Sequence, residues 1–174
     1  EDGNDVTQQV SDDRGVVRLK VDAGVHPNAS ELIPGYHALV IGINQYANFG
    51  TKGWSDLQTA RNDARQIADQ LNTEYGFDVR LLVDEAATRD TILQELDAIA
   101  TSYPDDAILI YYAGHGYYKE DVGQGYWIPS DARKNTEDGH LAKQDWIWNS
   151  TIQEILNSTQ SKHVLMIADS CFSG

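Results

Sequence analysis

Two residues of this sequence, His115 and Cys171, have side chains that together could attack a carbonyl group by covalent catalysis. A thiolate is an effective nucleophile when a base takes the thiol proton and an acid later protonates the leaving group. An imidazole can fill both roles near neutral pH. Gly114 and Gly116 flank the histidine and permit a sharp bend and a close approach of substrate. The backbone N–H groups of Gly116 and Cys171 are candidates for stabilising a developing oxyanion.

Each of these residues follows a segment that we predict to be a buried strand. Short and nearly all-apolar runs, typical of strands covered on both faces, occur at 37–43, 79–83, 107–112 and 162–168. Amphipathic stripes between them predict helices from Ser55, which has capping-box spacing to Gln58, from a cap at Thr88 to before Pro104, and around 151–156.

Strand–helix alternation of this kind predicts an α/β fold, a three-layer α/β/α sandwich with a mainly parallel sheet and right-handed crossovers. Ligands of such sheets bind beyond the carboxyl ends of the strands, where His115 and Cys171 both lie. We predict that the organised domain covers residues 36–174 and that residues 1–35 form an N-terminal arm or linker, with one short strand near 16–21.

Composition narrows the classes of partner. Thirteen lysine and arginine residues against 27 aspartate and glutamate residues give a formal charge of −14, which repels nucleic acids and anionic membranes and attracts basic peptides. No apolar run approaches the ~18–20 residues needed to cross a bilayer. We expect a soluble protein and favour the cytoplasm, although the compartment stays open. The single cysteine excludes an internal disulfide and a thiolate zinc cluster.

Taken separately, both residues have ordinary structural interpretations. A cysteine after an apolar strand is usually an inert core residue, and a histidine in a glycine turn is often structural. Function is favoured because both residues follow plausible parallel strands and one is flanked by glycines.

Two short blocks carry a family resemblance. Tyr111-Tyr-Ala-Gly-His-Gly116 and Asp169-Ser-Cys-Phe-Ser-Gly174 resemble the signature blocks of the caspase–metacaspase superfamily. Their separation, 171 − 115 = 56, is close to the ~50 residues typical of caspases. Leu39–Asn44 resembles the first strand of that superfamily, and Trp127–Pro129 resembles its segment after the histidine. The resemblance spans residues 36–174 and is strongest to metacaspases and bacterial caspase homologues (orthocaspases).

The resemblance implies the caspase–haemoglobinase type of fold and a cysteine endopeptidase with a Cys171–His115 dyad, an acyl-enzyme, and an oxyanion site at the backbone of Gly116 and Cys171. It also implies that residues 36–174 are a large-subunit portion. We therefore expect a zymogen activated by proteolysis, with its own C-terminal small-subunit fragment as a partner.

Substrate preference is implied by the acidic residues that match the metacaspase pocket. Asp169 stands where caspases have glutamine, and Asp63, within Ala60-Arg-Asn-Asp63, matches the aspartate that joins the same pocket. The implied substrate is a peptide or protein with Arg or Lys before the scissile bond. Ala60 and Ala113 replace more polar pocket residues of some metacaspases.

No cofactor is predicted. The acidic calcium site of many metacaspases has no convincing counterpart. Glu120 and Asp121 are too few acidic residues to form it, and no EF-hand spacing occurs. Two alternatives to an active peptidase remain: an inactive caspase-like protein-interaction module, and a nucleotide-binding domain, which lacks a phosphate loop of the expected form.

Overall fold

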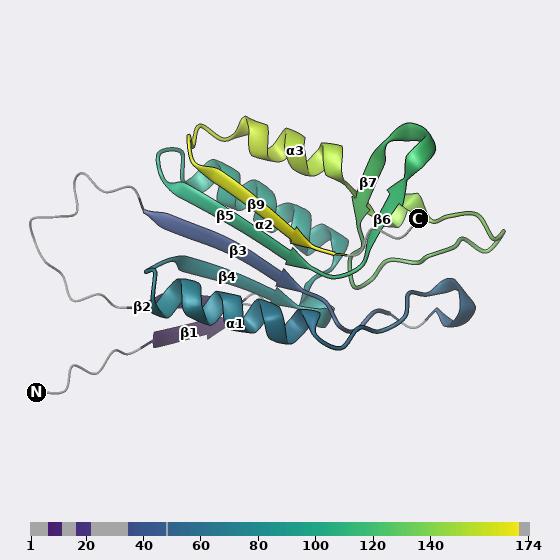
Figure 1. Ribbon diagram of the computed structural model, residues 1–174, viewed down its shortest axis with the longest axis horizontal. Helices are drawn as coiled ribbons and strands as arrows, with labels where there is room; N and C mark the ends of the chain where they lie inside the picture. The colour runs from purple at the N-terminus through teal and green to yellow at the C-terminus, as the bar shows by residue number, and fades with distance from the viewer. Residues whose placement is uncertain (1–6, 12–16, 22–34, 48, 171–174) are drawn as a thin grey trace, which may run out of the picture.

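The computed structural model describes residues 7–11, 17–21, 35–47 and 49–170 (Figure 1). They form a six-stranded sheet in the order β1-β2-β4-β3-β5-β9 and a small sheet in the order β6-β7-β8. The strands of the large sheet are β1 (Thr7–Ser11), β2 (Val17–Val21), β3 (Tyr36–Gly42), β4 (Asp78–Val83), β5 (Ala107–Ala113) and β9 (Val164–Asp169). The small sheet contains β6 (Gly116–Lys119), β7 (Gln124–Trp127) and β8 (Ile147–Trp148). The helices are α1 (Ala60–Thr73), α2 (Arg89–Ser102) and α3 (Asn149–Ser158).

The expected α/β architecture is confirmed. Strands β4, β3, β5 and β9 are mutually parallel, and β1 and β2 join the β4 side of the sheet in antiparallel fashion. Helix α1 covers one face of the sheet, and α2 and α3 pack together on the other (Figure 1). The three layers therefore bury the central strands on both sides, which explains their nearly continuous apolar sequence.

Alternation along β3 separates the two halves of the core. Ala38 and Val40 belong to the apolar cluster under α1, whereas Leu39 and Ile41 belong to the cluster under α2 and α3. Gly42 closes the strand, and a Cβ there would lie 2.4 Å from the Cβ of Ala64. A glycine is therefore required for α1 to approach the end of β3 this closely.

The predicted start of the first helix is wrong, whereas the cap of the second is confirmed. Thr88 accepts a hydrogen bond from the N–H of Thr91 at 3.2 Å, as an N-cap should. Helix α1 begins at Ala60 and not near Ser55, and its own N-cap residue makes no side-chain cap bond. The Asn44 side chain, which follows β3, instead accepts from the N–H of Arg61 at 2.9 Å. A distant residue thus performs the capping that the local spacing suggested.

Two regions contain strands that the sequence did not reveal. The segment expected to be an arm holds β2, which matches the expected short strand, and also β1, which pairs with it. The stretch after His115, which the sequence suggested to be irregular, forms the β6-β7-β8 sheet. These strands have four, four and two residues, too short for a reliable period. No helix in the described part of the chain is long and apolar enough to cross a membrane.

Candidate active site

His115 lies at the carboxyl end of β5, one residue before β6 begins. Its backbone is held from both sides, because its N–H donates to the hydroxyl of Tyr46 at 2.8 Å and its carbonyl accepts from the hydroxyl of Tyr112 at 2.6 Å. Both tyrosines are buried. A Cβ on Gly114 would lie 2.7 Å from the Tyr112 hydroxyl oxygen, so this turn requires a glycine. The histidine therefore has a fixed position at the sheet edge.

The imidazole of His115 is oriented by a backbone carbonyl. Its Nε2 lies 2.8 Å from the carbonyl oxygen of Ser55, in the segment before α1. Because a carbonyl oxygen can only accept, Nε2 carries the hydrogen and donates it. In the neutral ring Nδ1 is then the unprotonated nitrogen, and it is the atom able to take a proton from a nucleophile.

The surroundings of His115 favour its neutral form. The Tyr46 and Trp54 rings pack against the imidazole, with ring centres 4.9 and 5.3 Å away. Burial lowers the pKa of His115, and the charge of Lys134 lowers it further, against the hydrogen bond to Ser55, which raises it. A histidine that is neutral near pH 7 is ready to act as a general base.

Three of the predicted site residues line one pocket. His115, Asp63 and Asp169 all border a cavity of about 410 Å³ at the carboxyl ends of the strands. Ala60 and Ala113 form part of its wall. Asp169 pairs in register with Ala113 across β5 and β9, and Asp63 lies in the first turn of α1. A pocket beside the histidine thus presents two carboxylates, and we name it the Asp63–Asp169 pocket.

The phenol of Tyr111 contacts one of the two carboxylates of this pocket. Its hydroxyl lies 3.4 Å from Oδ2 of Asp169 and donates to it. Burial raises the pKa of Tyr111, and the charges of Asp169 and Asp63 raise it further. The phenol therefore stays protonated and can only serve as a hydrogen-bond donor to Asp169. Within the described ranges no basic side chain forms an ion pair with either aspartate.

Sequence reasoning missed the residues that hold the segment bearing Ser55. Asp84 is buried, and its carboxylate accepts from the N–H groups of Asn44 and Gln45 and pairs with Arg61 at 2.9 Å. Its φ of +47° lies in the left-handed region, a strained conformation for a residue other than glycine. Neither a backbone carbonyl nor a strained aspartate has a sequence signal that could have revealed it.

Cys171 lies outside the described residues, so the Cys171–His115 dyad stays a prediction. Of the expected oxyanion pair, Gly116 is buried at the start of β6, beside His115, and the Cys171 N–H lies outside the described ranges. Between residues 35 and 170, as far as described, no three His, Cys, Asp or Glu side chains cluster as metal ligands. Asp121, considered above for calcium, pairs with Lys119 at 2.8 Å.

The sequence is similar to a known protein family and to proteins within it. The family model described as Caspase domain matches residues 36–174. The chain is 27% identical over 154 residues to Metacaspase-1A of Neurospora crassa, which covers 79% of this chain and 31% of that protein. It is 30% identical over 95 residues to Metacaspase-1 of Saccharomyces cerevisiae, covering 49% of this chain and 21% of that protein. The chain thus spans less than a third of the length of these relatives.

A solved structure shares the fold. The protein GSU0716 of Geobacter sulfurreducens superimposes with a TM-score of 0.65 at 24% identity, covering 81% of this chain and 52% of that one. At this identity the likeness supports the fold alone. It agrees with the α/β fold that the strand order shows.

Proposed function

Because this chain belongs to the caspase domain family, a family of cysteine peptidases, we propose that it is the large-subunit portion of an endopeptidase that cleaves after Arg or Lys. The observation that carries the proposal is the position of His115 on the wall of the Asp63–Asp169 pocket. A base with a free Nδ1 and a doubly acidic pocket lie together at the sheet edge where the nucleophile's strand ends.

The proposed reaction uses His115 as a base and as an acid. Nδ1 takes the proton of the Cys171 thiol, and the thiolate attacks the carbonyl carbon of the scissile bond. The backbone N–H groups of Gly116 and Cys171 stabilise the oxyanion, and the imidazolium then protonates the departing amine. Water, deprotonated by the same imidazole, then attacks the acyl carbon, and the carbon–sulfur bond breaks to release the new carboxyl terminus. The imidazolium returns its proton to the Cys171 sulfur. Ser55 keeps the ring in one tautomer throughout, since its carbonyl holds the Nε2 hydrogen.

Specificity follows from the two carboxylates. Without a basic partner in the described part of the chain, Asp63 and Asp169 repel each other, and an arriving guanidinium or ammonium group relieves that repulsion. Each charge-assisted hydrogen bond contributes about 1.5–3 kcal/mol, so a basic side chain is preferred over a neutral one of similar size. An aspartyl side chain would add a third negative charge to the same pocket.

Tyr111 is a positioning residue in this proposal. Asp169 belongs to β9, whose residues are all exposed, so its backbone alone does not confine its side chain. The phenol donates to one carboxylate oxygen and leaves the other oxygen for the substrate.

A covering partner for β9 completes the proposal. The strand pairs with β5 on one side, and Val164, Leu165, Met166 and Ile167 are 38–54% exposed. An exposed apolar strand edge is a template for association. We assign this edge to the enzyme's own C-terminal small-subunit fragment, produced by proteolytic activation. Size-exclusion chromatography followed by denaturing mass spectrometry of the native enzyme checks this, and an active species that contains no such fragment or segment would contradict it.

Cleavage of a positional peptide library by the native protein tests the function. We expect cleavage after Arg or Lys and none after Asp.

Cys171→Ala should abolish turnover while the fold is retained. Asp169→Asn should lower kcat/KM for basic peptides by about tenfold to a hundredfold, the effect of one charge-assisted bond. Turnover by Cys171→Ala would exclude the mechanism, and a preference for aspartyl peptides would exclude the pocket assignment.

A further inference from the structure

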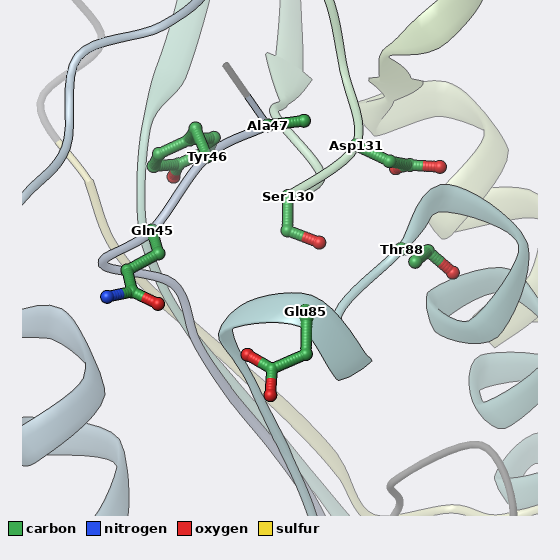
Figure 2. Close-up of a pocket in the computed structure, with 7 residues that line it drawn as sticks. All are labelled: Gln45, Tyr46, Ala47, Glu85, Thr88, Ser130 and Asp131. Atoms are coloured by element: carbon green, nitrogen blue, oxygen red, sulfur yellow. The ribbon is translucent and has the colours of Figure 1, made fainter.

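A second pocket lies at the same edge of the sheet, on the other side of Tyr46. It has a volume of about 260 Å³ and is bordered by segments that follow β3 and β4 and by the segment after β7 (Figure 2). We name it the Glu85 pocket. Its lining residues are Gln45, Tyr46, Ala47, Glu85, Thr88, Ser130 and Asp131.

Ser130, a buried residue, presents its hydroxyl to this pocket, and the hydroxyl has no partner in the described part of the chain. The residue is only 4% exposed, and its backbone is fully used, since its N–H donates to Ala87 at 3.0 Å and its carbonyl accepts from Ala47 at 2.7 Å. Its side chain forms no hydrogen bond with another described residue. The hydroxyl points into the space between Glu85 and Thr88 (Figure 2). The Ser130 hydroxyl is therefore available to bond a polar ligand atom in the pocket.

The charges around the Glu85 pocket select a cation. Glu85 is exposed and has no ion-pair partner among the described residues. Asp131 uses one carboxylate oxygen to accept from the N–H of Arg89 at 2.9 Å, which leaves the other oxygen for a ligand. The Arg89 guanidinium is directed elsewhere, since it donates to the carbonyl of Trp146 and pairs with Asp90 at 3.9 Å. Two carboxylates and a hydroxyl fit an ammonium or guanidinium group, whereas an anion would be repelled.

The place of this pocket relative to His115 identifies which part of a substrate would carry the cation. Tyr46 lines the Glu85 pocket, and its hydroxyl accepts the N–H of His115, which itself lines the Asp63–Asp169 pocket. The contact between Tyr46 and His115 thus links the two pockets. A general acid must face the departing amine. The part of a substrate that runs past His115 toward Tyr46 is therefore the part after the scissile bond.

We propose that the Glu85 pocket is a second specificity site, which binds a Lys or Arg side chain within the first three residues after the scissile bond. The inference rests on the proposed function, because it takes its direction from the roles of His115 and the Asp63–Asp169 pocket. The preferred substrate therefore has basic residues on both sides of the bond that is cut.

Peptides that differ only after the scissile bond test the site with the native protein. All have the same sequence up to and including a cleaved lysine, and one lysine, glutamine or glutamate is placed in turn at each of the next three positions. At one of these positions we expect kcat/KM for lysine to exceed that for glutamine by about fivefold, the effect of a partly exposed ion pair. Glutamate at that position should be cut more slowly than glutamine.

Variants assign this preference to the pocket. Glu85→Gln should bring the lysine-to-glutamine ratio close to one. Ser130→Ala should lower the ratio part of the way. Glu74→Gln is a matched control, because the same charge is removed beyond the far end of α1, and the ratio should not change.

The outcomes separate the two proposals. Equal cleavage of all the peptides, or a lysine preference that survives Glu85→Gln, would overturn the second specificity site and leave the peptidase intact. Failure of the native protein to cut any of the peptides would overturn both.

Discussion

The amino ends of the parallel strands and the Asp63–Asp169 pocket at their carboxyl ends use charged residues in opposite ways. At the amino ends of the strands, Arg80 pairs with the buried Glu95 at 3.1 Å and lies over the ring of Tyr103. His37 stacks on the same ring and lies 2.8 Å from Asp106. At the carboxyl ends, Asp63 and Asp169 have no basic partner within the described ranges.

On the proposed function, this difference separates structural charges from charges that bind substrate. Buried charges without partners are costly, so a fold that serves only itself pairs them, as the amino-end network does. Carboxylates that face a pocket and have no basic partner are candidates for binding a cationic ligand. Mutations in the amino-end network should therefore change stability, and mutations in the Asp63–Asp169 pocket should change activity.

The largest effect expected from this comparison is on stability. Arg80→Ala removes the charge facing Glu95 and should lower the free energy of unfolding by about 3 kcal/mol, because a buried carboxylate loses its ionic partner. The activity per folded molecule should be unchanged. Thermal unfolding and active-site titration measure the two quantities. Arg65→Ala, an exposed arginine of α1, is the control and should shift the stability by less than about 0.5 kcal/mol. A variant that kept its Tm and lost activity would reverse the roles of the two ends.

A smaller effect is expected from the hydroxyl of Tyr111. Tyr111→Phe removes the donor to Asp169 and should raise KM for arginyl peptides about fivefold, the effect of about 1 kcal/mol, with kcat within about twofold. Steady-state kinetics with arginyl and lysyl peptides provide the measurement. Tyr75→Phe, at a residue that is 66% exposed, should leave both constants unchanged. A fall in kcat with an unchanged KM would show that the hydroxyl acts in the transition state and not on substrate binding.

The smallest effect is expected in the pH dependence of activity, as a shift of its acidic limb. His115 must be neutral to act as a base, and its pKa is lowered from 6.5, mainly by burial. Activity should therefore persist below the usual imidazole range, and the acidic midpoint of kcat/KM should lie under pH 6.5. Lys134→Ala removes one cause of the lowering and should move the midpoint upward. A midpoint that moved downward in this variant would contradict the electrostatic account of His115.

The sequence predicted the fold well wherever a pattern is local. Apolar runs located all four parallel strands of the large sheet, and the Thr88 cap lies where the spacing placed it. The resemblance at residues 111–116 and 169–174 agrees with the Caspase domain match. His115, Asp63 and Asp169 are found on one pocket, while their roles remain proposals.

What the sequence could not predict depends on distant contacts. Ser55 and Gln58 match a capping box, yet Asn44 donates to the Gln58 carbonyl and accepts from Arg61, so tertiary bonds replace the local cap. The Ser55 carbonyl then orients His115 from 60 residues away. A carbonyl is common to every residue, and only the folded chain shows which one is used.

The double hydrogen bond of Asn44 has a consequence for the order of folding. A helix that carries its own cap can form its first turn alone, but the first turn of α1 takes its cap from the end of β3. Nucleation within residues 60–73 can therefore precede the sheet, whereas the amino end of the helix is secured only when β3 is in place. The segment that carries Ser55 takes its final position in the later steps of folding, because the loop from 44 to 61 must close first. Hydrogen exchange at the Arg61 amide would then report on docking of the helix to the sheet and not on fraying of the helix itself.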